Sequence, residues 1–360
     1  MVFSFPYFFL ERSGGGWLLQ LLLLTGALVL TTQPGAHAQD VYFSQPFATR
    51  LHTNPAFAGL LDDYSVTLAF RNQFPTLTGS FRSVQLAADL RPDRPRVPGQ
   101  HHGYGLLLNR DRSGTGTYVR LEAGGIYSYH TRLTRQFALA AGVRASYGRQ
   151  SIDYTNLIFG DQLAADGSNL GPTAEALNGR AANYLTVGLG TVLYSENAWL
   201  SLVGQHLNQP NLAFQKPKTS LPLLLGISGG YKVFINKPGP GKSPNELSFT
   251  PVAGFTQQGG SQRWETGLYA TAAPITLGAV YRNIALGSSV ARQQALALVV
   301  GVQTGTLRLG YSYDAALSDL SAEVGGAHEV TLGIRAFDKL ENAFRRLKRR
   351  DYPLAPCPAF

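Results

Sequence analysis

The sequence is poor in charge and has one cysteine among its 360 residues. Charged residues make up 15% of the chain, whereas a soluble globular domain carries about a quarter. The lone Cys357 excludes an intramolecular disulfide. Apart from one stretch near the N-terminus, no apolar run approaches the roughly 20 residues that a membrane-spanning helix needs. The composition therefore argues against an ordinary soluble domain and against a bundle of membrane helices.

The apolar stretch at residues 17–30 has the features of a secretory signal peptide. Arg12 precedes it and Ala36-His37-Ala38 follows it, which gives a basic region, an apolar region and a cleavage site in that order. We expect residues 1–38 to be removed by cleavage near Ala38, so that the mature chain begins at Gln39. A membrane anchor is the alternative, although the stretch is short for a span. The formal net charge of +9 does not indicate a nucleic-acid partner here, because the chain is predicted to be exported.

Glycine and aromatic residues are abundant, and apolar and polar positions alternate after residue 60. The chain contains 40 glycines, 17 tyrosines and 19 phenylalanines. The alternation is clearest at residues 137–144, 184–194, 306–314 and 330–335. Since successive side chains of a strand point to opposite faces, each segment predicts a strand with one apolar face and one small or polar face.

Alternating strands suit both a soluble β-sandwich and a membrane barrel, and two details favour the barrel. The polar faces carry glycines and charges, and the apolar faces end in aromatic residues such as Tyr127, Tyr147, Tyr194 and Tyr281. Closure of a barrel also pairs every backbone group within the bilayer. The sequence therefore predicts an all-β fold, a transmembrane antiparallel β-barrel of the outer membrane with about 14 strands, over residues 61–337. The expected strands are 64–73, 81–91, 103–110, 117–130, 135–148, 181–194, 198–208, 223–234, 246–257, 263–272, 274–284, 294–303, 306–315 and 327–337.

Two segments lie outside the predicted barrel. Residues 39–60 form an N-terminal periplasmic or plug segment, with a turn signal at 54–59. Residues 338–360 form a basic tail that would face the periplasm. The tail is either a docking segment for an acidic partner or a solvated helix or disordered end. Its docking residues would be Arg345, Arg346, Lys348, Arg349 and Arg350.

Several charged residues fall at inward positions of the predicted strands. A narrow lumen must pair its charges, which predicts a salt-bridge lattice among them. Because arginine exceeds the acids in this set, an anion-selective pore is the alternative. The residues are Arg120, Glu122, Arg144, Arg282, Arg308, Asp314 and Arg335.

The sequence carries no motif for catalysis, for a cofactor or for a metal. It lacks H-E-x-x-H, zinc-ligand spacing, G-x-S-x-G and a phosphate loop. The adjacent His101 and His102 would point to opposite faces of a strand. Ser128 and His130 share a face, but no orienting carboxylate can be argued for them, so ordinary strand polarity is the better interpretation. We therefore expect a protein that is not an enzyme and that binds no cofactor.

Short motifs follow one another along the chain and together resemble a known family. They begin with Gln39-Asp40, the segment 43–45 and the turn Asn54-Pro55-Ala56-Phe57-Ala58-Gly59. The strand from Tyr64 ends in Arg71-Asn72-Gln73. With Ser151-Ile152-Asp153-Tyr154, which is similar to a central segment of that family, these motifs resemble the PorP/SprF family of type IX secretion membrane proteins of Bacteroidota. The last hairpin holds residues 309–314 and Gly326, His328 and Glu329, and the chain ends in a C-P-x-F motif that contains Cys357, Pro358 and Phe360.

The resemblance implies an outer-membrane barrel of FadL-like size in the type IX secretion system, often tied to gliding motility. Such a protein helps to secrete or anchor large surface adhesins by binding their C-terminal sorting region. Its partners would be outer-membrane lipid, a secreted surface adhesin and periplasmic components of the secretion system. The family offers no catalytic residues to carry over. The alternative function is a FadL-like or porin-like passive transporter of a small, anionic or hydrophobic solute.

Overall fold

The computed structural model describes most of the predicted barrel and the segment before it. The described residues are 40–77, 79–92, 100–114, 118–154, 157, 159–164, 168, 171–173, 181–214, 219–236, 246–286, 292–317 and 325–335. The predicted signal peptide and the basic tail at 338–360 lie outside these residues. Among the described residues, no helix is long and apolar enough to span a membrane.

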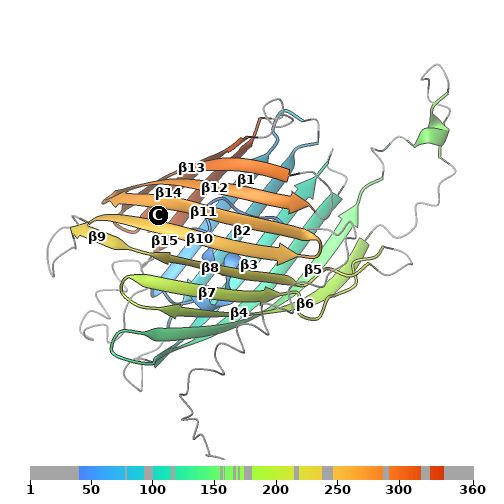
Figure 1. Ribbon diagram of the computed structural model, residues 1–360. Helices are drawn as coiled ribbons and strands as arrows, with labels where there is room; N and C mark the ends of the chain where they lie inside the picture. Colours follow the sequence, from blue (N-terminus) through green and yellow to red (C-terminus); the bar gives the residue numbers. More distant parts are fainter. Residues whose placement is uncertain are drawn as a thin grey trace, which may run out of the picture.

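The strands form one closed antiparallel barrel, which confirms the predicted fold (Figure 1). Apart from β8, which pairs with β10, each strand pairs with the next along the chain, and β15 pairs with β1. Strands β8 and β9 lie on either side of Lys232 and both pair with β10, so they occupy one position and the barrel has 14 positions. The strands are β1 (Tyr64–Gln73), β2 (Phe81–Leu90), β3 (Gln100–Ser113), β4 (Tyr118–Arg132), β5 (Ala138–Ile152), β6 (Ala181–Tyr194), β7 (Ala198–Gln205), β8 (Leu224–Tyr231), β9 (Val233–Asn236), β10 (Leu247–Gln258), β11 (Ser261–Ala272), β12 (Ile275–Leu286), β13 (Arg292–Thr304), β14 (Leu307–Ala316) and β15 (Ala327–Arg335).

Apolar side chains cover the outside of the barrel, as the alternation predicts. Leu106 and Leu185 are each 66% exposed, whereas inward neighbours such as Thr186 are buried. A soluble protein does not expose a continuous apolar band of this kind, but a barrel in lipid requires one. Tyr194 was predicted to lie on the apolar outer face, and this prediction was wrong. It has the parity of Thr186, points inward and is 1% exposed, because its ring packs in the interior apolar cluster.

The two ends of the barrel differ in the length of their connections. We name them the Tyr64 end, where β1 begins, and the Gln73 end, where β1 stops. The turns at 273–274 and 305–306 lie at the Tyr64 end, and the long connections at 153–180 and 206–223 lie at the Gln73 end. The Gln73 end also holds the two-residue turn at 259–260, and the Tyr64 end holds the connection at 91–99, but the two longest connections share the Gln73 end. Outer-membrane barrels typically carry their longest loops on one side.

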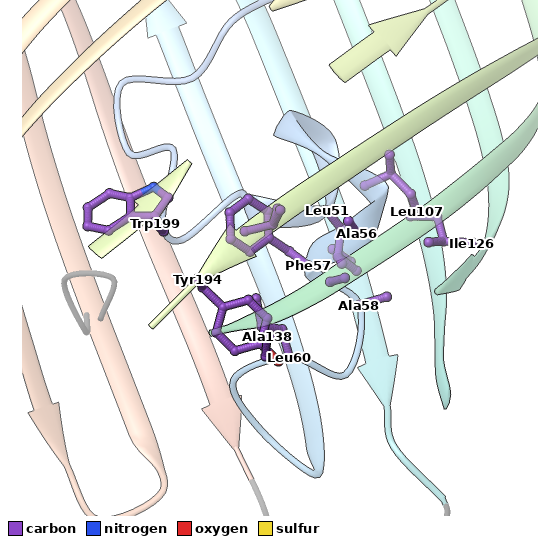
Figure 2. Packing of buried hydrophobic residues seen from close by; sticks show 13 residues of the cluster. Leu51, Ala56, Phe57, Ala58, Leu60, Leu107, Ile126, Ala138, Tyr194 and Trp199 are labelled. Atoms are coloured by element: carbon purple, nitrogen blue, oxygen red, sulfur yellow. The ribbon is translucent and has the colours of Figure 1, made fainter. Parts of the chain in front are cut away.

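Residues 40–62 lie inside the barrel, and we call them the plug segment. The segment contains a helical turn, α2 (Arg50–Thr53), and a 3-10 turn, η1 (Pro55–Phe57). Figure 2 shows these turns between Leu107 and Ile126 on one side and Tyr194 and Trp199 on the other. The apolar core of the molecule therefore forms between the plug segment and the inner wall. A further 3-10 turn, η2 (Gly160–Gln162), lies in the long connection between β5 and β6 (Figure 1).

Candidate functional site

Ion pairs between the plug segment and the wall form a charged network across the lumen, which we call the lumen lattice. Its seven arginines and seven acids are Arg50, Arg71, Arg120, Arg144, Arg263, Arg282 and Arg308, and Asp40, Asp62, Asp89, Glu122, Glu265, Asp314 and Glu329. The formal charges of this set are equal and opposite. Within the described part of the chain, the balance supports a structural lattice rather than a positively charged lumen.

Arg71 of β1 joins the plug segment to the last two strands. Its Nη2 donates to Asp314 of β14 at 2.7 Å, and its Nη1 lies 3.2 Å from Glu329 of β15. Glu329 also accepts hydrogen bonds from the backbone N–H groups of Ser44 and Gln45, at 2.6 and 3.0 Å. Arg71 donates in addition to the Ser44 hydroxyl. Charge-assisted hydrogen bonds among buried groups are strong, so this cluster fixes the start of the plug segment on the wall.

A tyrosine of the plug segment sits among three guanidinium groups. The Tyr42 ring centroid lies 4.8, 4.9 and 4.6 Å from the guanidinium carbons of Arg71, Arg263 and Arg282. Arg282 is almost fully buried and donates to Glu265 at 2.6 Å, while Arg263 lies 3.2 Å from the same carboxylate oxygen. Each contact places a cation over the negative face of the ring, which stabilises the arrangement. The Tyr42 ring therefore adds an attractive contact for each of three neighbouring guanidinium groups, which repel one another.

A second cluster of the lattice lies at the Tyr64 end. Arg50 of α2 donates to Asp62 at 3.3 Å and to Asp89 of β2 at 2.9 Å. Arg308 of β14 donates to both oxygens of Asp62, at 2.8 and 3.1 Å. Arg335 shares this end but stands apart, because it donates to the backbone oxygen of the β13–β14 turn at 3.2 Å. The plug segment is thus tied to the wall at its last residues as well as its first.

A third cluster lies at the Gln73 end and holds the first described residue. Arg120 of β4 donates to Asp40 at 2.7 Å and lies 3.4 Å from Glu122, which lies 3.9 Å from Arg144 of β5. His206, just after β7, lies 2.5 Å from the other Asp40 oxygen. Burial acts to raise the pKa of Asp40, but the attraction of Arg120 and His206 outweighs it and holds this pKa well below its usual range. Asp40 therefore remains ionised in the folded barrel.

The Asn54–Gly59 turn is bound to the wall through the Asn54 amide. Its Nδ2 donates to Ser201 Oγ at 2.8 Å and to Leu202 O at 2.9 Å, and its Oδ1 accepts from the backbone of Ala56 at 2.9 Å. Pro55 and Ala56 are buried with it in η1. The amide oxygen caps the 3-10 turn and the amide nitrogen bonds to β7, so this position uses both the acceptor and the donor of an asparagine side chain.

Glycines of the inner wall make room for this turn. A Cβ at Gly190 would lie 1.9 Å from the Asn54 oxygen, and one at Gly103 would lie 2.1 Å from the Ala58 oxygen. Gly59 itself has a φ of +66°, where a side chain is strained, and its N–H donates to Asp89 at 2.9 Å. The glycine-rich inward faces therefore reflect close backbone approach by the plug segment.

Other residues of the resemblance lie away from the lattice or outside the described residues. Asn72 and His328 are neighbours across the β1–β15 pair on the outer face, and His328 Nδ1 lies 2.9 Å from the Tyr311 hydroxyl. Gly326 has a φ of +61° and lies against the backbone oxygen of Asp314. The residues outside the described part are Cys357, Pro358, Phe360, Arg345, Arg346, Lys348, Arg349 and Arg350.

The buried serine and histidines have a structural arrangement. Ser128 Oγ lies 3.0 Å from His130 Nε2, and both lie within 2.9 Å of the Ala58 backbone oxygen. His101 stacks on His130 at 4.1 Å, whereas His102 is on the outer face beside Tyr127. Within the described residues, no group of histidine, cysteine and acidic side chains is arranged to hold a metal ion. Ser128 and His130 position the Gly59 turn rather than line an accessible pocket.

The plug segment leaves one side of the lumen unfilled. A cavity of about 130 Å³ separates it from β7, β8, β10, β11 and β12. Aromatic and aliphatic side chains line much of it, and the charged lining residues are Arg50, Arg263, Glu265 and Arg282. Among the lining residues are Tyr42, Phe47, Trp199, Val252, Arg263 and Tyr269.

Sequence reasoning missed half of the lattice. Asp89 and Glu265 occupy inward positions of β2 and β11, so strand parity could have identified them. Asp40 and Asp62 lie in the plug segment, where no periodicity indicates which way a side chain points. The matching acids of the lumen arginines are largely these missed residues, which is why the sequence suggested an excess of positive charge.

The chain is similar to one protein family in sequence and, distantly, to several transport proteins of known structure. A sequence model of the family described as type IX secretion system membrane protein PorP/SprF matches residues 36–334. No curated protein matches significantly. The toluene transporter TbuX of Ralstonia pickettii is 13% identical with a TM-score of 0.47, covering 81% of this chain and 94% of its own. The CymD monoaromatic hydrocarbon channel is 10% identical with a TM-score of 0.43, covering 86% and 98%. At such identities the likeness concerns fold alone.

Proposed function

The chain belongs to the PorP/SprF family of type IX secretion system membrane proteins, and on this premise we propose that it is a non-enzymatic barrel that helps to secrete or anchor large cell-surface proteins. The cargo is a gliding-type adhesin, bound through its C-terminal region. The observation that carries the proposal is that the plug segment occupies the lumen and that ion pairs hold it to the barrel wall at both ends. A lumen held in this way favours a role in binding over one in conduction.

The proposed orientation follows from the connections. An even-numbered bacterial barrel has short periplasmic turns and longer extracellular loops. The two longest connections at the Gln73 end therefore favour an orientation with the Tyr64 end in the periplasm. The connections at 153–180 and 206–223 then face the secreted partner. Strand β15 ends at Arg335 on the periplasmic side, and the basic tail at 338–360 follows it in sequence. The tail is therefore suited to dock on an acidic periplasmic component of the secretion system.

The test is to isolate the tagged full-length protein from its native host after mild detergent extraction and to identify its partners by mass spectrometry. Recovery of a large secreted adhesin or of periplasmic secretion proteins supports the proposal. A matched variant lacking residues 338–360 should lose the periplasmic proteins and keep the adhesin. Recovery of the barrel alone, with normal adhesin secretion in a deletion strain, contradicts it. N-terminal sequencing of the isolated protein should begin at Gln39.

The second candidate is a passive transporter of a small solute, and the cavity beside the plug segment favours it. Single-channel recording in a planar bilayer separates the two functions. The anchoring barrel should remain closed, because the plug segment crosses the lumen and is bound to the wall at both ends. Steady conductance by the purified protein alone would favour the transporter.

A further inference from the structure

The cavity beside the plug segment has a polar part and an apolar part that lie at different heights in the barrel. In the cross-strand register, Arg263 is level with Thr256 and lies towards the Gln73 end. Val252 comes earlier in β10 and is level with Trp199 through their shared partner in β8. Tyr269 lies lower still, towards the Tyr64 end. A molecule in the cavity would therefore meet the Arg263 cation towards the Gln73 end and a group of apolar side chains, which we call the floor, towards the Tyr64 end.

Among the three arginines around Tyr42, Arg263 makes the fewest hydrogen bonds. It donates one long hydrogen bond, from Nη2 to Thr256 Oγ1 at 3.4 Å, and its Nε faces Glu265 without forming a hydrogen bond. Its side chain is 23% exposed, whereas that of Arg282 is 1% exposed. A guanidinium carries five N–H donors in a fixed fork that matches a carboxylate. Arg263 thus has donors free to bind an anion inside the cavity.

The floor sets the size and character of the rest of the ligand. Phe47 of the plug segment packs edge-on against Trp199 at 5.6 Å and against Tyr269 at 5.3 Å, and Val252 packs beside them. The cavity measures about 130 Å³, and an engineered apolar cavity of about 150 Å³ binds benzene. The cavity as a whole therefore has a volume close to that needed for one aromatic ring or one branched aliphatic group.

From these contacts we propose that the cavity is a binding site for an apolar carboxylate, with its carboxylate on Arg263 and its ring or short chain on Phe47 and Trp199. This chemistry is found in small arylalkanoic or branched-chain acids and in the C-terminal residue of a polypeptide that ends in an apolar side chain. With a polypeptide end as its ligand the site rests on the proposed function, whereas with a small acid it does not.

The probe is 3-phenylpropionate, titrated calorimetrically into the full-length protein in lipid nanodiscs. The uncharged 3-phenylpropanamide keeps the ring and shape but removes the charge. We expect the acid to bind about tenfold or more tightly than the amide, since a charge-assisted hydrogen bond contributes about 1.5–3 kcal/mol. Equal binding of acid and amide, or no binding of the acid, overturns the proposal.

Two variants act on the site by different routes. Arg263→Gln removes the cation and should weaken binding of the acid about tenfold while leaving the amide unchanged. Gly254→Leu fills the cavity, because a Cβ at Gly254 meets Ser228 only at 3.5 Å and the added chain points inward; it should abolish binding of both probes. The matched control is Gly125→Leu, where a Cβ on the outer face meets nothing within 4 Å. Binding that survives Gly254→Leu as it survives Gly125→Leu places the acid elsewhere and refutes the site.

A competition experiment identifies the source of the ligand. A tripeptide ending in phenylalanine is compared as the free acid and as the C-terminal amide. Displacement of 3-phenylpropionate by the free-acid peptide alone supports the site with a polypeptide end as its ligand. Binding of the small acid without competition by either peptide supports it with a small acid as its ligand. Equal displacement by both peptides overturns the role of the carboxylate.

Discussion

Replacing Arg71 by methionine should release the plug segment without unfolding the barrel. The substitution leaves Glu329 buried without the cation that lies 3.2 Å from it, whereas Asp314 keeps Arg282 at 3.2 Å. Removing one partner of a buried ion pair costs about 3–5 kcal/mol. If this cost falls on the docked state of the plug segment, its opening equilibrium rises by about two to three powers of ten, at 1.4 kcal/mol for each.

The assay is hydrogen–deuterium exchange of the Ser44 and Gln45 amides, which donate directly to Glu329. Their exchange should accelerate by about a hundredfold or more in Arg71→Met, following the change in the opening equilibrium. The double variant Arg71→Met/Glu329→Gln should recover much of the protection, because it removes the uncompensated charge. Arg335→Met is the control, since Arg335 donates one hydrogen bond at the barrel end. Unchanged exchange at Ser44 and Gln45 in Arg71→Met would refute the claim that the lattice holds the plug segment.

Three further predictions test the fold and its pH dependence. Gly190→Val should prevent docking of the Asn54 turn, seen as faster proteolysis of residues 40–62, while Gly125→Val should be cleaved at the rate of the parent. Burial, reinforced by Arg144, lowers the pKa of His52 to about 4. Below the normal histidine pKa of about 6.5, His52 therefore binds a proton in the undocked segment but not in the docked one. Docking should weaken as pH falls from 6.5 to 4. Asp40 acts in the same direction at lower pH, because its pKa is depressed. Proteolysis of residues 40–62 measures the His52 effect between pH 6.5 and about 4, and its extension to lower pH measures the Asp40 effect. Leu189→Arg, on the lipid face of β6, should destabilise the barrel by about 2–4 kcal/mol in reversible unfolding from liposomes, whereas Leu189→Met should change it little.

Strand parity predicted the barrel and the inward direction of its charges, because the period of two fixes the face of every residue in a strand. It correctly placed Arg120, Arg144, Arg282 and Arg308 inside. It could not predict their partners across the lumen, since Asp40 and Asp62 belong to an irregular segment whose path depends on the whole cavity. Tyr194 is a different case. Its parity placed it inside, but its aromatic character suggested the bilayer interface.

The glycines show a different limit. The sequence showed that they lie on the polar faces of the strands, but it does not say which backbone approaches which glycine. Gly103 and Gly190 are required by Ala58 and Asn54, which come before them in the chain by many residues. The cavity was equally invisible, because it is defined by the side of the lumen that the plug segment leaves empty.

The contact between the plug segment and Glu329 has a consequence for how the barrel closes. Arg71 and Glu329 face each other directly in the pairing of β1 with β15, the seam that joins the two ends of the strand sequence. A slip of one residue at this seam would turn Glu329 towards lipid, because side chains alternate between faces. It would also withdraw the acceptor from Ser44 and Gln45. The hydrogen bonds of the first residues of the plug segment therefore form only in the register in which the last strand completes the barrel.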